Sequence, residues 1–127
     1  MPRSARGRRS LELMQRVAKS DTTFMRTGTR WIGKCLICNG WLSFDLRDGI
    51  GANLEHIVPR TAGGSSDLAN LALTHPQCNG EKGRHWDNAR RRRGRDAEYE
   101  ALLARLQERR RARWREPESA ATAPPAH

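Results

Sequence analysis

The 127-residue sequence contains little of the material from which hydrophobic cores are built. Only 36% of its residues are apolar, and four Trp, two Phe and one Tyr are its only aromatic residues. No stretch approaches the roughly 18 consecutive apolar residues of a membrane helix, so we predict no membrane span. A chain of this length has room for one domain with a modest core, for which a structural metal ion is a natural supplement.

Cysteine is also scarce. The count is three, and an odd number argues against a disulfide framework and for a reducing, intracellular setting. The basic N-terminal stretch is not followed by an apolar segment of about 7–15 residues, so we predict no secretory signal and a cytoplasmic location.

Acidic residues and lysine are few relative to arginine. Lys and Arg total 24 against 14 Asp and Glu, a net charge of +10, and only three of the 24 are Lys. Arginine matches phosphate in a bidentate fork, so this excess predicts a nucleic-acid partner; a GC-rich coding bias is the alternative explanation. The basic residues flank a slightly acidic centre at 35–83, which suits a nucleic-acid binder whose middle holds cations.

Composition and patterning divide the chain into five segments. We expect a disordered basic arm (1–9), an N-terminal helix and its connection (10–34), a central core (35–88), a basic C-terminal helix (89–116) and a disordered Ala/Pro tail (117–127).

Within the core, hydrophobic alternation and apolar runs predict three strands and a helix. The strands are expected at 41–46, 52–58 and 70–73, with a hairpin-type turn between the first two, and the helix at about 77–87 after Pro76.

Two pairs of metal-binding residues bracket this region. Cys35 and Cys38 have two residues between them, and so do His75 and Cys78. Pairs with this spacing can close a tetrahedron of three thiolates and one imidazole around Zn²⁺. Four protein ligands leave no open position, so the zinc would be structural. The alternative is three unrelated buried cysteines and a loop histidine.

Between the two pairs, polar residues and glycines follow one another in a recognisable order. They are Glu55-His56, Pro59, Gly63-Gly64, Asn70-Leu71 and, directly after Cys78, Asn79; His56 precedes Asn70 by 14 residues, and Asn70 precedes Asn79 by nine. Over roughly residues 35–83 the sequence resembles the HNH endonucleases with a zinc knuckle, in an H-N-N variant whose last motif position is Asn. Neither flank contributes to the resemblance.

The resemblance implies an α+β fold with a ββα-metal core, stapled by a structural zinc and flanked by basic helices. It implies an endonuclease that hydrolyses DNA with one divalent cation, Mg²⁺ or Mn²⁺. His56 would be the general base, Asn70 would orient the loop and the His56 ring, and Glu55 and Asn79 would hold the cation through oxygen. Glu55 stands where Asp is commoner, and His75 where Cys is usual.

Adjacent side chains on a regular strand point to opposite faces. Glu55 and His56 can therefore serve one site only if the strand ends or bulges near His56, and a regular strand through Val58 would count against the assignment. Taken singly, Glu55 fits an exposed strand carboxylate and His56 a packed core histidine. Asn70 fits a turn residue and Asn79 a helix-surface residue. The joint spacing favours the catalytic interpretation.

Basic and aromatic side chains are the candidates for DNA contact. The basic candidates are Lys82, Arg84, Arg90, Arg91, Arg92 and Arg93, and a second arginine cluster at 109–115 either contacts DNA or is a solvated helix face. Four tryptophans could stack on bases: Trp31, Trp41, Trp86 and Trp114. We expect Trp31 and Trp41 in the core, and Trp86 packed against the strands beneath the site.

Three functional hypotheses follow. The first is a metal-dependent HNH endonuclease acting on DNA, the second a non-catalytic zinc-knuckle DNA-binding module, and the third an enzyme acting on RNA. A homodimer is left open, because the apolar helix face at 99–106 could contact a second copy or its own domain.

Overall fold

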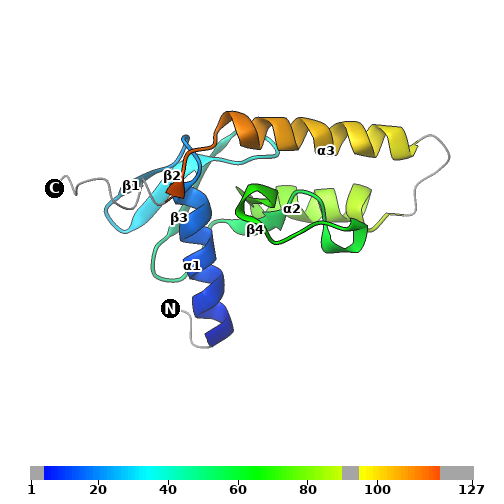
Figure 1. Cartoon of the computed structure of the whole chain (residues 1–127). Coiled ribbons are helices and arrows are strands. Elements are labelled where there is room, and N and C mark those ends of the chain that lie inside the picture. The colour runs from blue at the N-terminus through cyan, green and yellow to red at the C-terminus, as the bar shows by residue number, and fades with distance from the viewer. Residues whose placement is uncertain (1–4, 90–94, 118–127) are drawn as a thin grey trace.

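Two small antiparallel sheets and three α-helices form an α+β fold in the computed structural model, which describes residues 5–89 and 95–117 (Figure 1). In chain order the elements are α1 (Ala5–Lys19), β1 (Met25–Thr27), β2 (Arg30–Lys34), β3 (Trp41–Asp45), β4 (Asn53–His56), β5 (Leu71–Thr74), α2 (Pro76–Lys82) and α3 (Arg95–Ala112). Among the described helices, none has the length and apolar character needed to cross a bilayer.

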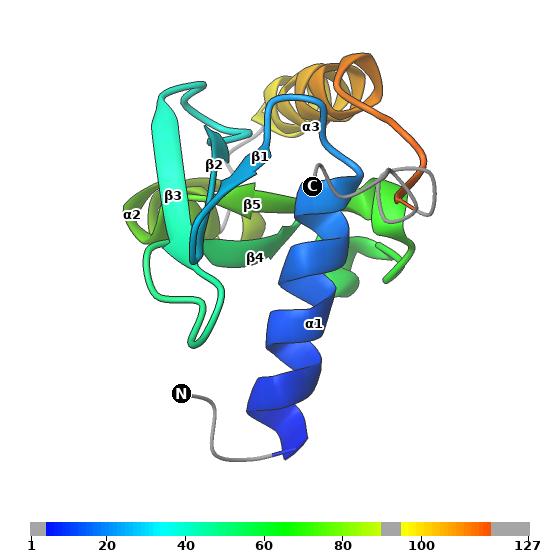
Figure 2. The same cartoon turned by 90° about the vertical axis from the view of Figure 1, so that its left-hand side faces the viewer.

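The strands pair in a different way from the predicted hairpin. β3 pairs with β2 in a β1-β2-β3 sheet, and β4 pairs with β5 in a second sheet, so the turn between β3 and β4 joins two sheets (Figure 2). Gly49 and Gly51 in this turn have φ of 76° and 119°, which favour glycine. The predicted pairing of 41–46 with 52–58 was therefore wrong, while all three strands were confirmed.

The N-terminal region is more ordered than predicted. Helix α1 begins at Ala5, so the part of the expected disordered arm that the structure describes is helical; Arg and Ala are good helix formers. The connection after α1 contains the β1–β2 hairpin, which the sequence analysis missed and which turns at Gly28 with φ of 61°. Residues 1–4 lie outside the described residues, and so do residues 118–127, which make up most of the predicted tail.

Strand β5 is the centre of the core. All four of its residues are buried, as expected for a strand covered on both faces. Leu71 and Leu73 pack in a cluster with α1 and the three-stranded sheet, whereas Ala72 packs with Ile57 and with Leu106 of α3. Burial of each leucine side chain contributes about 1.5–3 kcal/mol. The β4–β5 pair is thereby held between α1 on one side and α3 on the other.

Helix α3 packs on its own domain rather than presenting its apolar face to solvent. Tyr99 and Leu106 are buried, and Figure 1 shows α3 running alongside α2. The predicted helix start near Asp96 was correct. Residues 90–94, which precede it, lie outside the described residues.

The arginines of the cluster at 109–115 mostly point inward and bind backbone carbonyls. Arg109 Nη1 donates to the carbonyls of Leu36 (2.6 Å) and Ile37 (3.0 Å). Arg113 donates to the carbonyl of Lys34 and Arg115 to those of Lys19 and Phe24. Arg109, Arg113 and Arg115 therefore fit neither of the two alternatives from the sequence, DNA contact or a solvated helix face. They tie the C-terminal segment to α1 and to the start of the knuckle.

Arg110 makes the most extensive of these contacts. It is 1% exposed, and its guanidinium donates to the carbonyls of Leu71 (2.8 Å), Ser20 (3.0 Å) and Leu68 (3.2 Å) and to the Ser20 hydroxyl. One side chain therefore connects α3, the end of α1 and the β4–β5 unit.

Replacing Arg110 with Ala should lower the free energy of unfolding by about 3 kcal/mol or more, because several buried carbonyls lose their donors. Arg111→Ala is the matched control: Arg111 is exposed and pairs with exposed Glu108, so its loss should cost less than about 0.5 kcal/mol. Urea denaturation followed by circular dichroism measures both. Equal losses for the two variants would contradict the assignment.

Candidate active site and metal centre

The four predicted zinc ligands come together in the fold. Ligand atoms of Cys35, Cys38, His75 and Cys78 all lie within 4.8 Å of one another. The first pair lies in the turn between β2 and β3, and the second lies at the start of α2, where His75 is the N-cap. His75 Nδ1 lies 3.3 Å from Cys38 Sγ and 3.7 Å from Cys78 Sγ, so Nδ1 is the nitrogen that faces the thiols.

Surrounding groups suit this cluster to Zn²⁺. His75 Nε2 lies 2.8 Å from the Trp41 carbonyl, and a hydrogen bond there leaves the Nδ1 lone pair free for a metal. A hydrogen bond from the Gly40 backbone N–H lowers the pKa of Cys38 to about 7. Burial, together with the neighbouring thiols, raises the pKa of Cys78 to about 12. A dication removes this mutual repulsion, and three sulfurs with one imidazole form a donor set typical of structural zinc.

Strand β4 ends at His56, as the shared use of Glu55 and His56 requires. The ladder runs from Asn53, opposite Thr74, to His56, opposite Leu71, and no regular pairing continues to Val58. Glu55 is buried at 7% exposed, whereas His56 is half-buried. The two side chains thus leave the strand in different environments, with Glu55 towards α2 and His56 towards the following loop.

Asn70 holds the loop that follows His56. Its Oδ1 accepts a hydrogen bond from the Val58 backbone N–H (2.9 Å), and its Nδ2 donates to the carbonyls of Val58 (3.0 Å) and Ser65 (2.7 Å). The Asn70 carbonyl also accepts from the Ile57 backbone N–H. Asn70 therefore anchors both ends of the loop. Its predicted influence on the imidazole would act through the backbone, since its side-chain bonds go to the loop.

The His56 ring lies beside two side chains that the sequence analysis did not single out. Its Nε2 is 3.4 Å from Ser66 Oγ, which also accepts a hydrogen bond from Arg60 Nη2 (3.2 Å). The Ser66 hydroxyl therefore lies between the His56 imidazole and the Arg60 guanidinium. Partial burial, followed by the charges of Arg60 and Lys82, lowers the pKa of His56. A neutral ring at physiological pH is what a general base needs.

The face of α2 that carries Asn79 lies against β4. Asn79 is half-buried and lies one turn before Lys82, whose ammonium is 2.7 Å from Glu55 Oε2 and 3.4 Å from the His56 carbonyl. The contact with Glu55 is a short, buried ion pair. Burial raises the pKa of Glu55, and Lys82 opposes that rise. A buried carboxylate whose present partner is a cation, the Lys82 ammonium, is the kind of oxygen ligand that a hard divalent cation prefers.

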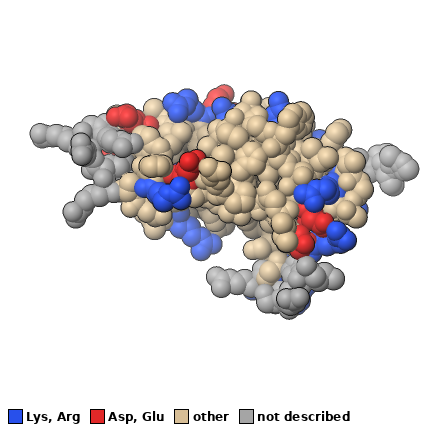
Figure 3. Space-filling view, turned by 180° about the vertical axis from the view of Figure 1, so that it is seen from behind, with Lys and Arg blue, Asp and Glu red and all other residues tan. Residues whose placement is uncertain are grey.

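The two predicted DNA-contact residues that the structure describes, Lys82 and Arg84, differ in exposure. Lys82 is 4% exposed and paired with carboxylates, so its predicted role in DNA contact is not compatible with this conformation. Arg84 is exposed, and Arg90, Arg91, Arg92 and Arg93 lie outside the described residues. On the face in Figure 3, basic side chains lie in separate groups around the edge, several of them beside acidic side chains.

The tryptophans differ from expectation in two cases. Trp31 is buried, as predicted. Trp41 is 70% exposed with the Lys34 ammonium 5.1 Å from its ring centroid, so its predicted place in the core was wrong. Trp86 stacks on Tyr99 of α3 at 5.9 Å between centroids, a partner that we did not predict. Trp114 donates from Nε1 to Glu116.

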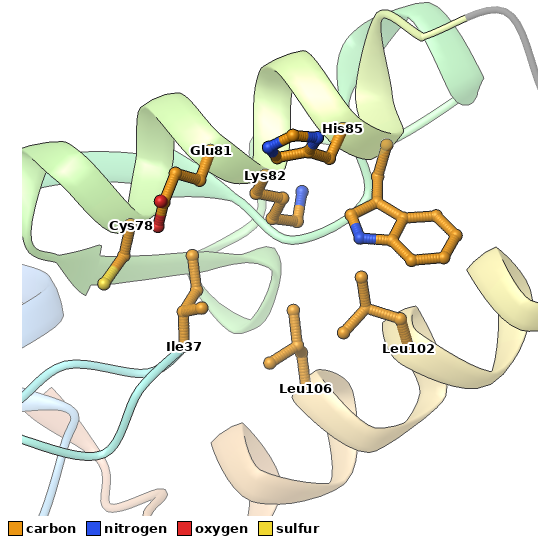
Figure 4. A pocket seen from close by; sticks show the side chains of 8 residues that line it. Ile37, Cys78, Glu81, Lys82, His85, Leu102 and Leu106 are labelled. Atoms are coloured by element: carbon orange, nitrogen blue, oxygen red, sulfur yellow. The ribbon is translucent and has the colours of Figure 1, made fainter.

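The helix that carries Asn79 continues beyond α2 as a π-helical turn, Gly83–Asp87. Between this helical segment and α3 lies an apolar cavity of about 330 Å³, which Figure 4 shows lined by Cys78, Lys82 and His85 on one side and by Leu102 and Leu106 on the other. The turn brings Asp87 to Lys82, at 2.8 Å. The sequence motif gave no reason to single out Asp87, because only the π-helical turn brings its carboxylate to Lys82.

Fold and site together define a class: a small α+β protein in which a Cys3His cluster supports a ββα unit with a histidine at a strand end. The family model of the HNH endonucleases matches residues 35–85, from the first cysteine of the cluster to the π-helical turn. The chain carries an HNH endonuclease domain at these residues, as the sequence resemblance implied. No curated protein and no solved structure matches the chain significantly.

Proposed function

We propose that the protein is a metal-dependent endonuclease that hydrolyses DNA phosphodiester bonds, with His56 as the general base. The observation that carries the proposal is the end of β4 at His56, where Asn70 holds the loop and the imidazole projects beyond the sheet. The HNH domain supports nuclease activity or DNA binding, and the charge of +10 is suited to a polyanionic substrate.

Glu55 and Asn79 are the residues that would hold a divalent cation, Mg²⁺ or Mn²⁺. When bound, the cation would stabilise the negative charge that develops on the scissile phosphate and the leaving oxygen. The neutral His56 imidazole would accept a proton from water as the water oxygen bonds to phosphorus. The P–O3′ bond would then break and the leaving O3′ would take a proton from solvent water, which gives a 3′-hydroxyl and a 5′-phosphate, the products that the family resemblance implies. Asn70 would keep the strand end in place during this step.

Plasmid cleavage tests the proposal. Zinc-loaded protein should convert supercoiled plasmid to nicked or linear product with Mg²⁺ or Mn²⁺, and leaving both cations out of the buffer should stop the reaction. Replacing the plasmid with RNA of similar length examines the RNA-directed alternative, and faster RNA cleavage would favour it. Absence of cleavage with every divalent cation would overturn the endonuclease proposal.

A non-catalytic DNA-binding module is the second candidate, supported by exposed Trp41, which offers a ring on which a base could stack. It would show salt-sensitive DNA binding, with a gel shift but no turnover. Homodimer formation and an intracellular location stay predictions. The only part of the dimer argument that the structure addresses is the α3 apolar face, which packs internally.

A further inference from the structure

Lys82 is a buried lysine shared between two carboxylates. Its ammonium lies 2.7 Å from Glu55 Oε2 and, on its other side, 2.8 Å from Asp87 Oδ2 and 3.0 Å from Asp87 Oδ1. Lys82 thus contacts one oxygen of Glu55 and both carboxylate oxygens of Asp87. The aliphatic part of Lys82 lines the apolar cavity between α2 and α3 (Figure 4). The ammonium can therefore keep Asp87 as a two-oxygen partner if its contact with the candidate metal ligand is lost.

Asp87 lies outside the segment that matches the HNH family, and a residue of α3 holds its side chain. It follows residue 85, the end of the match, and the Tyr99 hydroxyl of α3 donates a hydrogen bond to its Oδ1. Tyr99 is itself fixed by its stack on Trp86. Helix α3 thus positions the carboxylate that binds Lys82.

The charges of this group do not cancel. Glu55 and Asp87 carry two negative charges against one positive charge on Lys82, which leaves one net negative charge in a region where all three side chains are at most 10% exposed. Uncompensated charge in such an environment is costly, and a bound cation offsets it. The half-buried Asn79 precedes Lys82 by one turn on the same helix face, and its side chain carries an amide oxygen.

We propose that Asp87 is a positioning residue that holds the Lys82 ammonium away from Glu55 when a divalent cation binds there. The inference rests on the proposed function, because it assumes that Glu55 receives the cation. In the metal-free protein Lys82 contacts both carboxylates, and in the metal-bound protein it keeps Asp87 alone. Without Asp87 the ammonium would stay on Glu55 and repel the dication.

Mn²⁺ affinity of the zinc-loaded protein, measured by electron paramagnetic resonance titration, tests this directly. Thiolate-rich sites prefer Zn²⁺ to Mn²⁺, so the knuckle does not compete. Asp87→Asn should weaken Mn²⁺ binding about tenfold or more, because the net charge at the site rises by one. Lys82→Met should bind Mn²⁺ at least as tightly as wild type. Glu81→Gln, an exposed carboxylate change on α2, is the matched control and should stay within about twofold.

The double variant Asp87→Asn/Lys82→Met has the sharpest expectation. It restores the wild-type net charge of minus one, so its Mn²⁺ affinity should return to within about threefold of wild type. A merely structural role for Asp87 predicts instead that both single changes and their combination weaken binding. That pattern, or an unchanged affinity in Asp87→Asn, would overturn the inference.

Tyr99→Phe covers the case in which Asp87→Asn does not fold. It removes the hydrogen bond to Asp87 but keeps the ring against Trp86, and it should weaken Mn²⁺ binding about twofold to fivefold. Unchanged affinity in Tyr99→Phe would then overturn the inference. Failures are distinguishable: a wild type that binds no Mn²⁺ overturns the metal site and this inference together. A wild type that binds Mn²⁺ and cuts DNA, with Asp87→Asn unaltered, overturns this inference alone.

Discussion

Replacing His56 with Ala is expected to slow DNA cleavage by roughly 10²–10⁴-fold, the usual contribution of a positioned general base. The fold should tolerate the change. His56 is half-buried, and among the described residues its imidazole has one hydrogen-bond contact, with Ser66 at 3.4 Å. We therefore expect a loss in free energy of unfolding of about 1 kcal/mol or less. A large loss of rate with little loss of stability is the signature of a chemical role.

Single-turnover nicking of supercoiled plasmid measures the effect, with enzyme in excess so that product release does not limit the rate. His85→Ala is the matched control, since it removes an exposed imidazole from the same domain. Its rate should stay within about threefold of wild type, as for a surface change away from the site. Cleavage by His56→Ala at the rate of His85→Ala would show that the base lies elsewhere.

The pH dependence of the same reaction has a definite sign. The base must be neutral to accept a proton, and the pKa of His56 is lowered from its ordinary value of 6.5, chiefly by burial. Activity should therefore hold at neutral pH and fall only as the pH drops below about 6.5. A rate that halves already near pH 7.5 would indicate a different titrating group.

Loss of the zinc ion should unfold the β4–β5–α2 unit. His75→Ala removes one of four ligands and should lower the zinc content from about one ion per chain towards zero. Structural zinc sites contribute apparent binding free energies of about 10–16 kcal/mol, as much as a small domain's whole stability of about 5–15 kcal/mol. Helix α2 has only seven residues, including Gly80, so it depends on the cluster at its N-terminus.

Metal analysis by mass spectrometry and far-ultraviolet circular dichroism measure the outcome. His85→Ala again serves as the control, because it removes a histidine outside the cluster and should retain the zinc and the helical signal. A His75→Ala protein that keeps one tightly bound zinc and a wild-type melting temperature would remove the assignment of the cluster. Removal of zinc from the wild type by a chelator should reproduce the loss of structure.

The four residues of the Cys3His cluster could be predicted because each of its two ligand pairs has a short spacing. Two residues between Cys35 and Cys38, and two between His75 and Cys78, place each pair of ligands in one turn whatever the rest of the chain does. The end of β4 at His56 was predictable for a similar local reason, namely Pro59 three residues later.

The partners of buried charges could not be predicted, because they are set by contacts between distant segments. Arg110 lies 90 residues from Ser20 in the sequence, yet its guanidinium donates a hydrogen bond to the Ser20 carbonyl. The arginine cluster at 109–115, for which the sequence suggested DNA contact, therefore makes internal contacts between distant segments. Lys82, likewise predicted to contact DNA, is instead paired with Glu55 and Asp87, because β4 and the π-helical turn both approach it.

The amino-acid sequence alone predicted the four candidate zinc ligands, the position of His56 near a strand end, and the resemblance to the HNH family. It also singled out Asn70, which holds the loop after His56. Strand pairing, the inward direction of the C-terminal arginines, and the Glu55–Lys82–Asp87 group depend on three-dimensional packing. The physical reason is range. Spacing within a few residues constrains ligands and turns through backbone geometry alone. A buried ion pair forms wherever the fold brings opposite charges together out of water, and no spacing along the chain encodes that meeting.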